Sequence, residues 1–256
     1  YGNSLGDHFG VGHIFLAGEA PGLFYGYVTQ GIVQKEDITE NGIKYIKQDG
    51  SVGYYQTVNK TTPVAGDVKY VDRNGDGVVD DNDRDIIGNP NPDFTYGFQT
   101  KVSWKSLSLS ASFNGVQGRD ILNVGNRYNN TPGTKSNNVT RKAFQNMWTD
   151  ENPSNLYPKS TFVVQNMVMD RYVEDGSYLR CSDITLSYVL PAKWTNKIGI
   201  KNTSVYASVK NAFVITDYSG YDPEVNSFAF DGLRPGVDMN SYPTPRSFVF
   251  GLNLTF

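Results

Sequence analysis

Cysteine, histidine and long apolar runs are scarce in this sequence, and each shortage argues against a class of protein. Cys181 is the single cysteine, so the chain forms no internal disulfide and no cysteine metal cluster. His8 and His13 are the two histidines, and no third ligand stands at a set spacing from them. No run of eighteen apolar residues appears, which excludes a transmembrane helix. The net charge of −3, without a basic stripe, argues against a nucleic-acid partner.

Catalytic motifs are missing as well. The sequence contains no Gly-x-Ser-x-Gly elbow, no phosphate-binding loop and no Cys–His pairing. Asp222 and Glu224 are a carboxylate pair of the kind that glycosidases use, but they stand in a turn-like Tyr-Asp-Pro-Glu segment. We therefore expect a structural role for this pair, and we expect the protein not to be an enzyme.

The sequence is rich instead in alternating apolar and polar residues, most clearly over residues 246–256. Alternate positions of this segment are large and apolar: Phe248, Phe250, Leu252, Leu254 and Phe256. The positions between them are mostly small or polar, which predicts a strand with one apolar face. Tilted by ~40°, such a strand rises roughly 27 Å, close to the ~25 Å apolar band of an outer-membrane barrel.

Several other segments repeat this period of two and are predicted to be strands. The regular ones are 94–104, 106–114, 178–190 and 203–213, and the less regular ones are 23–33 and 13–17. Residues 139–148 carry apolar side chains near helical spacing, which predicts one short helix. The fold class is therefore all-β.

The connections between the predicted strands distinguish a barrel from a sandwich. Two links are short, at Lys105 and at 191–202, whereas the links 34–93, 115–177 and 214–245 are long. Long irregular loops are unusual in compact soluble domains, but an antiparallel barrel with short periplasmic turns and long external loops predicts this asymmetry. Transmembrane barrels have at least about eight strands, so strands from elsewhere must complete the sheet. The alternative is a secreted, calcium-stabilised β-sandwich that binds glycans.

A set of motifs spread along the chain resembles one family. They are GEAPGLFYGY at 18–27, GDVKYVDRNGDG at 66–77, IGNPNPDFTYG at 87–97, DGSYLR at 175–180, YSGYDPE at 218–224, YPTPR at 242–246 and FGLNLTF at 250–256. Their order and content resemble the SusC/RagA-like TonB-dependent outer-membrane transporters over nearly the whole sequence.

The resemblance implies a barrel of about 22 strands in the outer membrane of a Gram-negative bacterium. Residues 1–256 would form its C-terminal part, with the plug and the N-terminal strands not in this chain. It further implies import of oligosaccharides, or of peptides, together with a SusD-like surface lipoprotein and with TonB acting through the missing N-terminal part. Phe256 would be the signal read by the barrel-assembly machinery, and the apolar strand faces would contact outer-membrane lipid.

One loop has the spacing of a calcium site. Counted from Asp72, oxygen-bearing side chains fall at positions 1, 3, 5, 9 and 12, and a glycine falls at position 6. The predicted Ca²⁺ ligands are Asp72, Asn74, Asp76, Val78 through its carbonyl, Asp80 and Asp83. The ion would stiffen a long loop, and the alternative is a solvated acidic loop with Asn-Gly and Asp-Gly turns.

The predicted external loops are rich in aromatic and amide side chains that suit either sugars or a protein partner. Examples are Tyr128, Asn129, Asn130, Trp148, Tyr157, Tyr218, Tyr221 and Phe228. The sequence alone does not assign substrate contacts among them.

Overall fold

The computed structural model describes residues 12–131, 138–160, 167–195, 200 and 202–255, and it contains two compact units. Unit 1 comprises Tyr1–Asn91, Asp120–Glu174 and Val225–Ser241. Unit 2 comprises Pro92–Arg119, Asp175–Glu224 and Tyr242–Phe256. No helix in the described part of the chain is long and apolar enough to cross a membrane.

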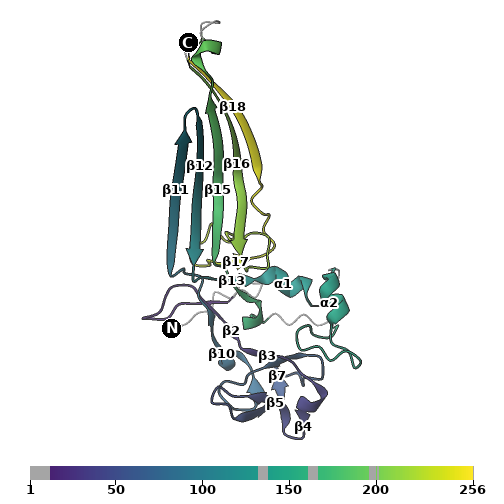
Figure 1. Cartoon of the computed structure of the whole chain (residues 1–256). Coiled ribbons are helices and arrows are strands. Elements are labelled where there is room, and N and C mark those ends of the chain that lie inside the picture. Colours follow the sequence, from purple (N-terminus) through teal and green to yellow (C-terminus); the bar gives the residue numbers. More distant parts are fainter. Residues whose placement is uncertain (1–11, 132–137, 161–166, 196–199, 201, 256) are drawn as a thin grey trace. The chain divides into compact units, whose positions relative to one another are not determined.

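Unit 2 is one antiparallel sheet of five long strands (Figure 1). Its strands are β11 (Phe94–Trp104), β12 (Leu107–Gln117), β15 (Tyr178–Val189), β16 (Asn202–Thr216) and β18 (Ser247–Thr255), in that order across the sheet. Lys105, in the left-handed region at φ 53°, lies in the two-residue turn between β11 and β12. The short helix α3 (Ala192–Thr195) follows β15.

The register of unit 2 gives the sheet two chemically different faces. On one face Leu109 lies between Val102 and Leu186, and this apolar row continues across β16 to Phe250. On the other face Ser110 lies between Lys101 and Thr185. The apolar side chains are exposed, with 78% of Phe250 accessible. A sandwich would bury this face against a second sheet, so the exposure favours a sheet that meets lipid.

Unit 1 consists of short strands, two α-helices and three 3₁₀ turns around its own core. One three-stranded sheet consists of β1 (His13–Ile14), β2 (Leu23–Tyr27) and β10 (Arg84–Gly88). A second consists of β4 (Ile38–Thr39), β5 (Gly42–Ile46) and β6 (Val52–Tyr55). A two-stranded sheet pairs β3 (Thr29–Ile32) with β8 (Val68–Tyr70). A further two-stranded sheet pairs β7 (Thr57–Val58) with β9 (Val78–Val79). In the last sheet, β13 (Asp120–Asn123) lies between β14 (Val173–Asp175) and β17 (Val237–Asp238). The helices are α1 (Val124–Asn129) and α2 (Arg141–Asn146), and the 3₁₀ turns are Lys35–Asp37, Asp81–Asp83 and Asp170–Tyr172.

The structure confirms the five regular strands and corrects the first long connection. Residues 34–93, expected as an irregular external loop, form much of unit 1, and they bury Tyr45, Tyr55 and Tyr70 almost completely. The alternation of β5 and β6 on either side of a polar turn was the sequence signal for this part of the unit. A strand expected over 23–33 divides after Tyr27, because β2 pairs with β10 whereas β3 pairs with β8.

Smaller differences concern element ends. The helix expected over 139–148 exists as α2, which begins after Thr140, and the Thr140 side chain caps it by accepting a hydrogen bond from the N–H of Ala143. Only His13–Ile14 of the strand expected over 13–17 forms. Strand β12 continues beyond Asn114 because pairing with β11 extends to Gln117.

Candidate functional site

The polar face of unit 2 carries a connected set of side chains. The ammonium of Lys210 lies 2.7 Å from the Asp183 carboxylate. Thr185 and Ser208 each donate to the same carboxylate at 2.8 Å, and the two hydroxyls lie 2.9 Å apart. One carboxylate on this face is thus neutralised by one cation and held by two hydroxyls, which suits a face that meets water or a polar ligand.

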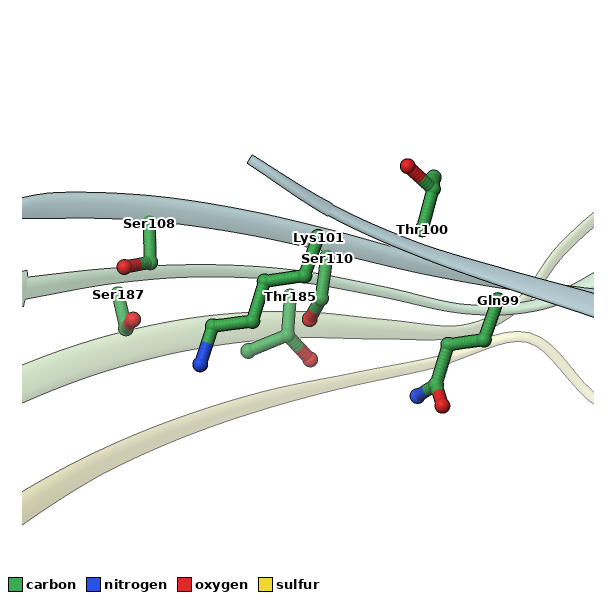
Figure 2. Close-up of a pocket in the computed structure, with 7 residues that line it drawn as sticks. All are labelled: Gln99, Thr100, Lys101, Ser108, Ser110, Thr185 and Ser187. Carbon is green, nitrogen blue, oxygen red and sulfur yellow. The ribbon is translucent and has the colours of Figure 1, made fainter. Parts of the chain in front are cut away.

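A hollow lies on this polar face beside the network, between β11, β12 and β15 (Figure 2). Figure 2 shows the side chain of Thr100 projecting from one side of the sheet and the other labelled side chains projecting from the opposite side. The lining residues are Gln99, Thr100, Lys101, Ser108, Ser110, Thr185 and Ser187. This hollow is therefore lined by hydroxyl and amide groups with one ammonium.

A β-bulge places a further charged side chain, that of Arg180, on the same face. In a regular strand successive side chains point to opposite faces, so Arg180 and Asp183, three positions apart, would lie on opposite faces of β15. The register shifts at Ser182, so that Asp183 pairs with Ser112 and Arg180 pairs with Asn114. Ser112 and Asn114 share the polar face, so the bulge brings the Arg180 side chain there as well.

Arg180 is 5% exposed and holds two carboxylates from the connection that follows β16. Its guanidinium contacts Asp222 at 2.5 Å and Glu224 at 3.1 Å. Glu224 also accepts hydrogen bonds from the Tyr178 hydroxyl at 2.7 Å and from the Asn114 amide at 3.0 Å. We call these five residues the Arg180 clamp. The expectation that Asp222 and Glu224 are structural is supported, because both are engaged with the arginine.

The clamp shifts the titration of Asp222. Burial alone would raise the pKa of this carboxyl, but hydrogen bonds from Glu224 and Thr244 and the charge of Arg180 together hold the pKa below its usual range. Arg119 donates to the carbonyl oxygen of Pro223, between the two carboxylates. The segment is thus tied to the sheet through both its side chains and its backbone.

The predicted calcium loop lies in unit 1 and runs from just after β8 through β9 to the end of the 3₁₀ turn Asp81–Asp83. Asp72 accepts hydrogen bonds from the N–H groups of Gly75 and Gly77 at 2.6 and 2.8 Å. Asp83 accepts them from Arg73 and Asp80, both at 2.8 Å. Both carboxylates are buried.

The other predicted ligands bond locally as well. Asn74 accepts from the N–H of Asp76, Asp76 from that of Val78, and Asp80 from that of Asn82. Burial, reinforced by the charges of Asp83 and Asp76, raises the pKa of Asp72 despite its backbone hydrogen bonds. In the described ranges, no group of three or more His, Cys, Asp or Glu side chains is arranged to hold a metal ion. Calcium binding here stays a prediction.

The remaining site residues divide between the core and the surface. Of the loop aromatics that the sequence offered for contact with sugars or with a protein partner, Trp148, Tyr157, Tyr218 and Phe228 are buried. Tyr221 stands apart because 72% of it is exposed. Phe256, the expected assembly signal, lies outside the described residues.

Comparison with known proteins gives consistent results. No family model matches the chain. It is 35% identical over 201 residues to TonB-dependent receptor P26 of Formosa agariphila, covering 75% of this chain and 20% of that protein. It is 33% identical over 248 residues to TonB-dependent receptor P3 of the same organism, covering 95% of this chain and 23% of that protein. It is 34% identical over 194 residues to TonB-dependent receptor SusC of Bacteroides thetaiotaomicron, covering 73% of this chain and 17% of that protein.

Solved structures give the same result. The chain is similar to the RagAB peptide importer in its open-open state, with a TM-score of 0.64, 26% identity, and coverage of 95% of this chain and 23% of that one. For the closed-closed state the TM-score is 0.65 at 25% identity, with coverage of 97% and 24%. The chain spans about a fifth to a quarter of the length of these relatives.

The two-faced antiparallel sheet and these similarities define a class. The chain is homologous to the TonB-dependent receptors, which lie in the outer membrane of Gram-negative bacteria. Within that class it is a SusC-like sequence.

Proposed function

We propose that this chain forms the C-terminal part of the barrel wall of a TonB-dependent importer. The observation that carries the proposal is the sheet of unit 2, whose exposed apolar face opposes a polar face with a neutralised ion pair. Lipid accepts the first face and an aqueous lumen accepts the second. Strand β12 has eleven residues, so at a tilt of ~40° it rises roughly 27 Å, enough for the ~25 Å apolar band.

Open sheet edges support the proposal that further strands complete the wall. In the described sheet, β11 and β18 each pair with one neighbour only. Hydrocarbon offers no water to satisfy the free backbone groups of such an edge, so a transmembrane sheet must close. Closure by strands from the rest of a receptor of about 22 strands meets this requirement.

The importer would take up oligosaccharides, with peptides as the alternative cargo. It would work with a SusD-like lipoprotein at the cell surface and with TonB through a part outside this chain, and Phe256 would act as the signal for barrel assembly. The similarity to SusC supports the pairing with a lipoprotein, and the peptide importer RagAB supports the alternative cargo. We assign the chain no catalytic step, because Asp222 and Glu224 are engaged with Arg180.

Uptake by intact cells tests this function. Cells that carry the complete receptor are expected to accumulate fluorescently labelled oligosaccharides such as maltoheptaose, xylohexaose or mannohexaose, as measured by cell fluorescence after washing. Deleting the receptor gene, or TonB in a matched strain, is expected to abolish accumulation. Equal accumulation in all three strains for every labelled sugar, and for labelled peptides, would contradict the proposal.

We further propose that the loop from Asp72 to Asp83 binds Ca²⁺. The support is that both buried carboxylates, Asp72 and Asp83, lack a lysine or arginine partner in the described part of the chain, whereas the exposed Asp81 and the half-buried Asp85 each have one. The remaining oxygens are Asn74, Asp76, Asp80 and the carbonyl of Val78. Outside the cell a site with a Kd of ~10⁻⁴ M would be mostly filled.

Metal stoichiometry tests the calcium proposal. Replacing Asp72 and Asp76 together by asparagine is expected to remove one bound Ca²⁺ per receptor, measured by mass spectrometry of metals after dialysis in millimolar Ca²⁺. Asp49→Asn is the matched control, because Asp49 is an exposed turn residue bonded to Ser51. If the double variant binds as much Ca²⁺ as the wild type, the loop is a solvated acidic turn.

A further inference from the structure

The segment Tyr218–Glu224 is anchored on both sides of one exposed aromatic ring. On the N-terminal side Tyr218 is buried, and its N–H donates to the Thr216 hydroxyl at 3.1 Å. On the C-terminal side Asp222 and Glu224 are held by the Arg180 clamp. Between these anchors, 72% of Tyr221 is exposed.

The anchors also fix the face of the sheet on which this segment lies. Asn114 pairs with Arg180 across β12 and β15, and Tyr178 pairs with Val116. All four positions share the polar face, since Asn114 and Val116 follow Ser112 at intervals of two. Because three of these side chains bond to Asp222 or Glu224, the anchored segment covers the polar face of unit 2.

An exposed tyrosine on an anchored backbone is suited to binding. The backbone around it loses little further conformational entropy when a ligand arrives, because the hydrogen bond of Tyr218 and the ion pairs of Asp222 and Glu224 already hold it. A tyrosine ring offers a large flat surface with only two side-chain torsions to fix. The charges beneath the segment are paired with one another, so they offer no free charge to a ligand. A neutral ligand with a flat C–H face matches this environment.

We propose that Tyr221 contacts the sugar rings of an oligosaccharide on the lumen side of the receptor, and that the Arg180 clamp positions it. This rests on the proposed import function and adds the residue that recognises the cargo. The ring of Tyr221 stacks on the C–H face of a pyranose, and Arg180 acts through Asp222 and Glu224 as a positioning residue. The ligand class is therefore a neutral glycan.

Calorimetric titration of the complete receptor in detergent with the sugar that cells accumulate best tests this inference. Tyr221→Ala is expected to weaken binding roughly 3- to 10-fold, the range of an aromatic stacking contact. Tyr221→Phe keeps the ring and is expected to bind like the wild type. Tyr54→Ala is the matched control, because Tyr54 is a partly exposed tyrosine on the solvent side of β6 in unit 1.

The positioning role of the Arg180 clamp is tested separately, by the mobility of a spin label at position 221. A nitroxide at position 221, introduced in a Cys181→Ser background, is expected to be immobile in the wild type and more mobile after Asn114→Ala, which removes one hydrogen bond to Glu224. Arg180→Met is expected to increase its mobility further. An equally immobile label in both variants would refute the positioning role of the clamp.

Failure of this inference differs from failure of the proposed function. If wild-type cells accumulate a labelled sugar but Tyr221→Ala binds it with unchanged affinity, the inference is wrong and import stands. Equal losses in Tyr221→Phe and Tyr221→Ala would replace stacking by a hydroxyl contact and also overturn it. If the receptor binds peptides from a casein digest and none of the three sugars, the glycan assignment is wrong.

Discussion

Replacing Ala111 by arginine is expected to destabilise the folded receptor in lipid by about 2–4 kcal/mol, the cost of a cation at the bilayer midplane of a barrel. Ala111 lies near the middle of β12, and its cross-strand partners are Thr100 and Ile184. This row belongs to the apolar face, so the new guanidinium would point into hydrocarbon. Denaturant titration in phospholipid vesicles, read out by heat-modifiable migration on gels, measures the change.

The neighbouring residue provides the control for this prediction. Ser112 is one position further along β12, so its side chain lies on the polar face, opposite Gln99 and Asp183. Ser112→Arg is expected to change stability by less than about 1 kcal/mol, because the new cation meets water and a carboxylate. Equal losses in the two variants would contradict the assignment of the faces.

Replacing Arg180 by methionine is expected to cost about 3–5 kcal/mol, because it leaves two carboxylates near one another without their cation. Asp222 and Arg180 are both buried, so solvent does little to compensate the loss. The triple variant Arg180→Met, Asp222→Asn, Glu224→Gln removes the charges together and is expected to recover most of the stability. The same denaturant titration measures all three proteins.

Acid provides a second test of the clamp. The folded pKa of Asp222 lies below its usual value, so its contribution to stability is present at neutral pH and is lost as the pH falls through the folded pKa. The difference between wild type and Arg180→Met is therefore expected to shrink in acid. A difference that is constant with pH, or no recovery in the triple variant, would show that Arg180 stabilises by packing alone.

Much of unit 2 was predictable from local pattern. The alternation of mostly large apolar residues with small or polar ones over 94–104 matches β11 end to end, because a period of two follows directly from strand geometry. The same reasoning fixed which side chains share a face wherever the register is regular. The strands of unit 1 were largely missed because many have two to five residues, too few for alternation to be recognised.

The Arg180 clamp could not be predicted from the sequence, for a different reason. Alternation along β15 assigns Arg180 to the apolar face with Ile184, and only the bulge at Ser182 moves it to the other side. Its carboxylate partner Asp222 is 42 residues away in sequence. Neither the bulge nor this long-range pairing leaves a local signal, so Asp222 and Glu224 were recognised as structural without their partner being known.

The most direct test of the two-faced sheet is a nitroxide scan along β12. Single cysteines at positions 108, 109, 110 and 111, in the complete Cys181→Ser receptor reconstituted in vesicles, carry the label one at a time. Oxygen is expected to relax the labels at 109 and 111 most strongly, whereas a polar nickel chelate is expected to relax those at 108 and 110. The same accessibility at all four positions, or the reverse alternation, would contradict the assignment of the apolar face to lipid.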